Sequence, residues 1–102
     1  MGNHSGTVRV HVRITGLVQG VGYRYYAYEA ARRLGLTGWV RNCADGSVEA
    51  EAQGGRDAVT RFLSQLGHGP RWAKVRDVDA TPIELHPETG TAGFRMQTDY
   101  RA

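Results

Sequence analysis

The first part of the chain changes its hydrophobic period within a few residues. Between residues 8 and 15 every second residue is Val or Ile, and the residues between them are polar. A period of two predicts a strand with one buried and one solvated face. From Tyr23 to Leu34 the apolar positions recur with a helical period, and Gly35 is typical of a helix end. A strand followed directly by a helix is therefore expected.

The middle of the chain again shows a strand pattern followed by a helical pattern. A turn signal, Ala44-Asp45-Gly46, separates two strand-like segments at 37–43 and 47–53, which predicts a β-hairpin. Apolar residues spaced i, i+3, i+4, i+7 between Val59 and Leu66 then predict a second helix. Residues 67–71, which contain two glycines and a proline, are expected to form a loop.

The last third predicts a strand at 74–81 and a short final strand around Phe94 and Met96. Val75 and Val78 break the alternation of the longer strand and indicate a β-bulge, and the polar stretch 84–92 connects the two. The order is strand, helix, strand, strand, helix, strand, with a short extra strand. Because each helix has one apolar side, both must cover one face of an antiparallel sheet. The predicted fold is an α+β, ferredoxin-like βαββαβ sandwich.

Length and composition favour one small globular domain. With 102 residues we expect a flexible tail at 1–6 and a single domain at 7–102. No apolar run approaches the ~20 residues of a membrane span, and the N-terminus has no hydrophobic signal core, so a cytoplasmic, membrane-free protein is expected. The single cysteine, Cys43, excludes an internal disulfide, and the histidines share no ligand spacing. We therefore predict neither a metal nor a cofactor.

The charge pattern argues against nucleic-acid binding. A net charge of +3 favours anionic partners only weakly. In the predicted fold the first and third strands are neighbours, which sets Arg9 and Arg13 against Glu49 and Glu51 on the solvated face. RNA-recognition domains of this topology carry stacking aromatics at these positions. The central strands have no such platform, so we expect no nucleic-acid partner.

The junction between the first strand and the first helix has the composition of an anion site. Gly16, Gly20 and Gly22 crowd this turn, and Arg24 follows inside the first helical turn. Unpaired N–H groups at a helix start attract anions, and glycines let successive N–H groups converge. An arginine adds a charged fork that matches phosphate oxygens. The usual nucleotide-binding patterns are absent, since no Gly-Lys-Ser/Thr occurs and Tyr25 replaces the third glycine of GxGxxG.

Two segments carry a family resemblance. Residues 16–24 (GLVQGVGYR) resemble the first signature of the acylphosphatase family, and residues 36–42 (LTGWVRN) with 45–48 (DGSV) resemble the second. The resemblance implies a ferredoxin-like fold and hydrolysis of acyl phosphates to a carboxylate and inorganic phosphate, without metal or cofactor. By motif position it implies that Arg24 binds the phosphoryl group and Asn42 orients the attacking water. The backbone N–H groups that would help to bind the substrate belong to Gln19, Gly20, Val21, Gly22 and Tyr23.

A second function class stays open beside the enzyme. A domain of this fold could bind phosphate without turnover, as a regulatory module, and acylphosphatase-like domains also occur inside larger carbamoyl-transferring maturation proteins. The free-standing length favours a monomeric enzyme that acts on a small acyl phosphate. The sequence marks no acyl pocket, so broad acyl specificity is expected. The conspicuous aromatic residues Trp39, Trp72 and Tyr25 are interpreted as scaffold without a site role.

Overall fold

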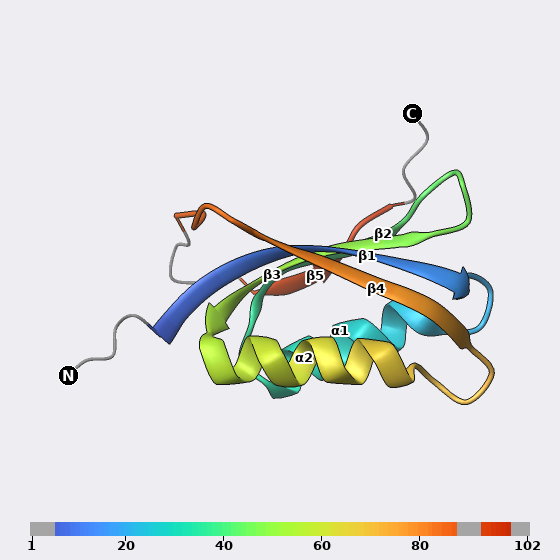
Figure 1. The fold of residues 1–102 in the computed structure, drawn as a ribbon, viewed down its shortest axis with the longest axis horizontal. Coiled ribbons are helices and arrows are strands. Elements are labelled where there is room, and N and C mark those ends of the chain that lie inside the picture. The colour runs from blue at the N-terminus through green and yellow to red at the C-terminus, as the bar shows by residue number, and fades with distance from the viewer. Residues whose placement is uncertain (1–5, 88–92, 99–102) are drawn as a thin grey trace.

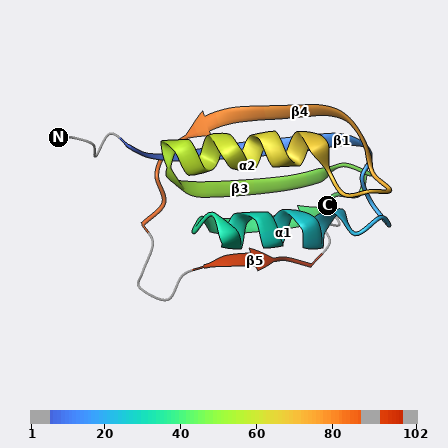
Figure 2. The ribbon, with the colours of Figure 1, turned by 90° about the horizontal axis from the view of Figure 1, so that it is seen from below.

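In a computed structural model that describes residues 6–87 and 93–98, a five-stranded sheet lies against two helices (Figure 1). Both helices cover the same face of the sheet, as the sequence predicts, and the α+β ferredoxin-like fold is confirmed (Figures 1 and 2). The elements are β1 (Thr7–Leu17), α1 (Tyr23–Arg33), β2 (Thr37–Asn42), β3 (Val48–Gly55), α2 (Arg56–His68), β4 (Lys74–Ile83) and β5 (Phe94–Met96).

The strand order is β4-β1-β3-β2-β5, so β1 and β3 are central neighbours, as predicted. The first four strands pair antiparallel, whereas β5 pairs parallel with β2 through Gly38–Phe94 and Val40–Met96. This pairing differs from the expected all-antiparallel sheet. β5 runs in the opposite direction to β4 and lies at the other edge of the sheet, beside β2. Because β2 runs in the same direction as β5, the two strands pair parallel.

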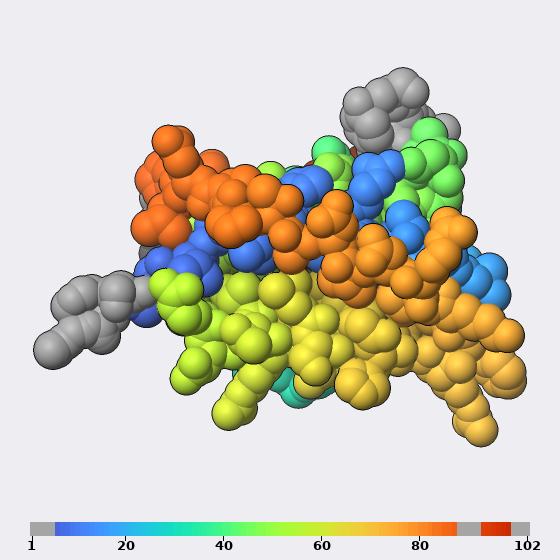
Figure 3. Space-filling view, viewed as in Figure 1, coloured from blue at the N-terminus to red at the C-terminus, as the bar shows by residue number. Residues whose placement is uncertain are grey.

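Strand β4 forms an edge of the sheet and runs along the outer surface above α2 (Figure 3). The predicted β-bulge is present on this edge: Thr15 faces Asp77 and Gly16 faces Val75, which leaves Arg76 as the extra residue. Gly16 has φ 124°, and a Cβ there would overlap the carbonyl oxygen of Lys74. Beyond the bulge β1 still pairs with β4 as far as Leu17 opposite Lys74, and the chain then enters the loop to α1.

The core fills the space between the sheet and the helices. Phe62 of α2 packs edge-on against Phe94 of β5, with ring centroids 5.8 Å apart. The Tyr23 hydroxyl donates to the Leu66 carbonyl at 2.6 Å, which ties the start of α1 to the end of α2. Buried strand residues include Val12, Ile14, Val40, Val48, Ala50 and Ala52, and buried helix residues include Ala27, Ala30, Ala31, Val59 and Leu66.

The second helix is longer than predicted. It continues to His68, so the first two residues of the expected loop at 67–71 belong to the helix. Gly69, with φ 69°, ends it instead. The predicted tail at 1–6 lies outside the described residues except for Gly6, as does the 88–92 part of the polar connection. In the part of the chain that the structure describes, no helix is long and apolar enough to cross a membrane.

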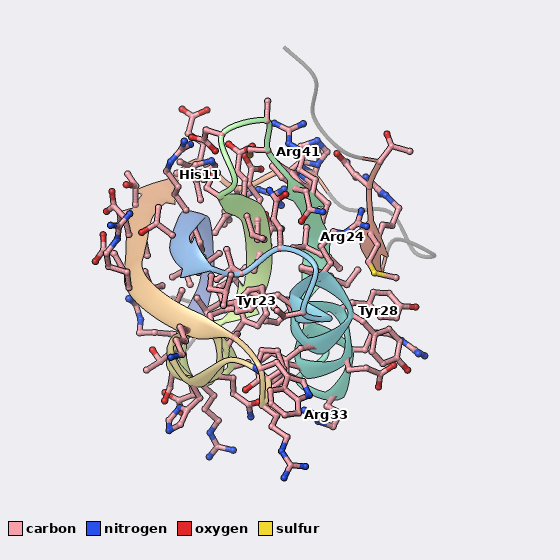
Figure 4. The ribbon with its side chains drawn as sticks, turned by 90° about the vertical axis from the view of Figure 1, so that its right-hand side faces the viewer. His11, Tyr23, Arg24, Tyr28, Arg33 and Arg41 are labelled. Carbon is pink, nitrogen blue, oxygen red and sulfur yellow. The ribbon has the colours of Figure 1, made fainter. Side chains whose placement is uncertain are left out.

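The face of the sheet opposite the helices carries ion pairs (Figure 4). Arg9 contacts Glu51 at 2.8 Å, and Glu49 contacts both His11 and Arg41. The predicted pairing of opposite charges across β1 and β3 is confirmed for Arg9, although its partner is diagonal, whereas Arg13 lies opposite Glu49 but pairs with Asp45 of the hairpin turn. Arg9, for example, lies directly opposite Gln53 in the register and reaches Glu51 two residues away.

Candidate active site

A pocket of about 230 Å³ opens where the β1–α1 loop, the start of α1, the end of β2 and the end of β5 meet. Arg24 and Asn42, the two residues that the sequence singles out for chemistry, both line it. Figure 4 shows Arg24 beside the β1–α1 loop at the start of α1. The lining residues are Val18, Gly20, Gly22, Tyr23, Arg24, Tyr25, Asn42 and Met96.

The β1–α1 loop has the backbone of an anion cradle. Gly20 and Gly22 adopt left-handed φ values of 75° and 79°, and an added Cβ would meet open space at either position. Conformation, not crowding, therefore requires glycine here. No described oxygen accepts a hydrogen bond from the N–H of Gly20, Val21, Gly22 or Tyr23. Left-handed residues that alternate with an ordinary one turn successive N–H groups toward a common concavity.

The start of α1 leaves its positive end available. Gly22 is the N-cap and offers no side-chain hydrogen bond, and the first turn contains no acidic residue. The buried side chain of Tyr23 anchors this turn to α2, and its burial raises the pKa of the phenol well above its usual range. The helix start is thus anchored by a neutral side chain, and its residues Gly22 and Tyr23 line the pocket, where the helix dipole favours an anion.

Gln19 fixes the loop to the β2–β3 hairpin. Its Nε2 donates to the carbonyl oxygens of Cys43 at 2.8 Å and Ser47 at 2.7 Å. Both carbonyls belong to the turn that directly follows Asn42. The side chain of Gln19 therefore sets the distance between the loop and Asn42. The sequence did not reveal this role, because only the backbone of Gln19 was expected to act.

Arg24 is half-buried and held from the side of β5. Its Nη1 donates to the carbonyl oxygen of Gln97 at 3.0 Å, and the N–H of Gln97 donates to Val40 at 2.8 Å. The guanidinium is thus positioned by the strand that pairs with β2. Sequence reasoning missed Gln97, and no pattern could have found it, because a backbone carbonyl of any residue type would serve.

Asn42 is the last residue of β2 and lies opposite Val48 of β3. Gly38, Val40 and Asn42 share the helix-facing side of the strand, as the alternation predicts, with Val40 fully buried. Asn42 brings a neutral amide, which can donate and accept hydrogen bonds but does not titrate. Cys43, expected to be a half-buried strand residue, follows β2 directly and is buried; burial raises the pKa of its thiol.

A larger pocket of about 290 Å³ lies near the same hairpin, but its charges already have partners. Among its lining residues, Arg13 pairs with Asp45, and Arg41 pairs with Glu49. Within residues 6–87 and 93–98, no group of three or more His, Cys, Asp or Glu side chains could hold a metal ion. The pocket with Arg24 and Asn42 is therefore the candidate active site.

Comparison with known proteins decides the family. The acylphosphatase family model matches residues 10–96. The chain belongs to the acylphosphatase family. An acylphosphatase of Bifidobacterium longum (strain NCC 2705) is 52% identical over 92 residues, which cover 90% of this chain and 95% of that protein. An acylphosphatase of Trichormus variabilis is 46% identical over 93 residues, covering 91% of this chain and 89% of that protein.

A solved structure supports the same assignment. An acylphosphatase from Coxiella burnetii superposes with a TM-score of 0.84 at 34% identity, and the match covers 95% of this chain and 99% of that one. Both signature segments lie within the matched residues, and the fold brings them to one pocket. Tyr25, which the sequence interpretation assigned to the scaffold, lines the candidate active site together with Met96.

Proposed function

We propose that this member of the acylphosphatase family hydrolyses the carboxyl–phosphate bond of small acyl phosphates in the pocket of Arg24 and Asn42. The products would be a carboxylate and inorganic phosphate. The observation that carries the proposal is that the glycine loop, Arg24 and Asn42 line one pocket although they come from two separate sequence segments. An anion cradle and a neutral amide opposite it suit attack by water on a bound phosphoryl group.

Binding of the phosphoryl group would rest on charge and on oriented donors. The N–H groups of Gln19 to Tyr23 and the dipole of α1 favour a dianion, and Arg24 adds a guanidinium fork. Hydrogen bonds to charged groups contribute ~1.5–3 kcal/mol each, so a few of them suffice to hold one phosphate. The hydrogen bond from Arg24 to the Gln97 carbonyl, at 3.0 Å, supports a guanidinium that is oriented before the substrate arrives.

In the chemical step, the oxygen of a water molecule would form a bond to phosphorus while the bond from phosphorus to the carboxyl oxygen breaks. The electron pair of that bond leaves on the carboxylate, which is a stable anion and needs no general acid. Phosphoryl transfer proceeds through a loose transition state, so positioning and charge stabilisation supply most of the catalysis. Asn42 would hold the water in line. Because an amide has no useful pKa, we assign the water's proton to a phosphoryl oxygen.

The proposed protonation route has its own test in the pH dependence of the rate. Neither a guanidinium nor an amide titrates between pH 5 and 9. We therefore expect log kcat to follow only the ionisation of the substrate's phosphate group. A second substrate with a different phosphate pKa provides the check. If the same inflection in the pH–rate profile persists with that substrate and disappears on substitution of a side chain, the proton of the attacking water passes to the protein instead.

The test of the function is hydrolysis of benzoyl phosphate by the purified chain, with a metal chelator present, beside the Arg24→Ala variant. We expect metal-free turnover that the substitution abolishes. Binding of inorganic phosphate without turnover by the wild-type chain would contradict the proposal and favour a non-catalytic phosphate-binding module of the same fold. Monomeric state and cytoplasmic location stay predictions, which sedimentation of the chain and fractionation of its source cells would check.

A further inference from the structure

Two exposed apolar side chains lie at the rim of the candidate active site. Of the residues that line the pocket, Val18 and Tyr23 are buried and form its floor, whereas Tyr25 and Met96 are 59% and 45% exposed. They come from different elements, α1 and β5. Each is next in the chain to one partner of the hydrogen bond between Arg24 and Gln97. Tyr25 follows Arg24 in the chain, and Met96 precedes Gln97, whose carbonyl accepts the hydrogen bond from Arg24.

The chemistry of the pocket fixes what such a rim would contact. A substrate whose phosphoryl group lies on the glycine loop and Arg24 must direct its acyl group away from the floor, toward solvent. The floor is closed by Val18 and Tyr23. The acyl group of the bound substrate therefore extends past the rim of the pocket. The exposed lining side chains large enough to cover it there are Tyr25 and Met96.

The surroundings of Tyr25 favour its ring as the contact surface. A hydrogen bond to the Glu29 carboxylate, together with the charge of that carboxylate, raises the pKa of Tyr25. Its ring lies 6.2 Å from the ring of Tyr28 on the same helix. Methionine complements an aromatic ring well, because its flexible thioether adapts to differently shaped apolar groups and makes favourable contacts with aromatic edges.

We propose that Tyr25 and Met96 form an acyl subsite, which makes acyl phosphates with an aromatic or long aliphatic acyl group better substrates than acetyl phosphate. This inference rests on the proposed function and sharpens the broad specificity expected from the sequence. The subsite contacts the part of the substrate that does not react. It therefore changes the ratio of kcat/KM values between substrates more than it changes the affinity for inorganic phosphate.

The test compares kcat/KM for benzoyl phosphate and acetyl phosphate in the wild-type chain and in the double variant Tyr25→Ser, Met96→Ser. The two substrates differ in intrinsic reactivity, but this difference cancels when the ratio in the variant is divided by the ratio in the wild type. We expect the preference for benzoyl phosphate to fall about tenfold, as the loss of apolar contact with a half-open rim implies. Butyryl and hexanoyl phosphates should rise in kcat/KM with chain length in the wild type and not in the variant.

A control variant and a second readout separate the possible outcomes. Leu85→Ser removes an equally exposed apolar side chain, 54% exposed and beyond the far end of β4, and should leave the substrate ratio unchanged. Competitive inhibition by inorganic phosphate reports whether the cradle of the double variant is intact. If both substrates are turned over and the ratio does not move in a variant that still binds phosphate, the acyl subsite is wrong and the hydrolase stands. If the wild-type chain turns over neither substrate, the proposed function fails and the subsite fails with it.

Discussion

The two helices begin in similar ways, yet only one beginning has the features of an anion site. Both have glycine at the N-cap and no side-chain cap. At α1 the cap, Gly22, is left-handed, the first turn holds no acid, and Arg24 follows. At α2 the cap, Gly55, has an ordinary φ of −60°, and Asp57 occupies the first turn.

The two helix starts have the same dipole and differ in the groups placed around it. Asp57 places a negative charge at the positive end of α2, so that end already has favourable electrostatics without a ligand. The start of α1 lacks this compensation and gains three further features: a left-handed glycine loop, an arginine held by Gln97, and the amide of Asn42 across the pocket. Each of these features can be removed separately, and the start of α2 supplies a matched control in two cases, Arg56 for Arg24 and Gly55 for Gly22.

The largest effect is expected from the arginine. Arg24→Ala should lower kcat/KM for benzoyl phosphate by about 10³-fold or more, because it removes the charged fork that we propose stabilises the transferring phosphoryl group. Arg24→Lys should recover little of the rate, since a point charge does not reproduce two parallel donors. Steady-state kinetics of both variants, with circular dichroism as the check on folding, would measure this.

The matched control is Arg56→Ala, which removes an exposed arginine from the first turn of α2. We expect its kcat/KM to stay within about twofold of the wild type, as is usual for a surface substitution away from the site. A comparable loss of rate in Arg56→Ala and Arg24→Ala would mean that general charge, and not the site at α1, governs catalysis.

Asn42→Ala should show the next largest effect and should separate binding from chemistry. If the amide orients the water, kcat falls by about 10²-fold while the inhibition constant of inorganic phosphate hardly changes. Both quantities come from one set of inhibition kinetics. An Asn42→Ala protein with nearly normal kcat would remove Asn42 from the mechanism.

Gln19→Met should have an intermediate effect, because it removes the two hydrogen bonds that hold the loop against the hairpin. Loss of these bonds should destabilise the protein by about 1–3 kcal/mol and lower kcat by about tenfold, since the loop and Asn42 would lose their fixed spacing. Denaturant unfolding and kinetics would measure the two effects. Gln53→Met is the control: Gln53 also bridges separate segments, through His86, but at the opposite end of β3. It should lose stability and keep its rate; equal rates in both variants would contradict the positioning role of Gln19.

The smallest effect is expected from the two glycine caps. Gly22→Ala forces a left-handed conformation on alanine and should cost about 1–2 kcal/mol of stability, together with a few-fold loss of rate. Gly55→Ala places alanine in an ordinary conformation with open space around the new Cβ. The lower entropy of the unfolded chain and the poorer N-cap preference of alanine offset each other, so the free energy of unfolding should change by less than about 0.5 kcal/mol. Gly22→Ala should therefore lose clearly more stability than Gly55→Ala. An equal change in both variants would show that the loop conformation at Gly22 is not the determinant.

Much of this comparison could be predicted from the sequence, because it is local. The change of period at Tyr23, the glycines before it and Arg24 after it lie within one short segment, and strand alternation places Asn42 on the helix-facing side. The parallel pairing of β5 could not be predicted, since a strand of three residues carries too little pattern to fix its neighbour.

The contacts between distant segments could not be predicted from the sequence for a different reason. The hydrogen bonds of Gln19 to Cys43 and Ser47, and that of Arg24 to Gln97, end on backbone carbonyls, which leave no mark on residue type. In the sequence, Tyr25 cannot be distinguished from any other exposed helix residue. Only the fold shows that Tyr25 and Met96 of β5 line the same pocket. The elements of the site were thus predictable, whereas the contacts that position them depended on the complete fold.

The central claim is that phosphate binds at the start of α1 and not at the start of α2. A titration of the ¹⁵N-labelled chain with inorganic phosphate, followed by amide chemical shifts, tests this claim most directly. We predict saturable shifts that are largest for the amides of Gly20 to Arg24, nearly absent for residues 56–59, and lost in Arg24→Ala. Equal shifts at both helix starts, or saturable binding that leaves the amides of the β1–α1 loop unmoved, would contradict it.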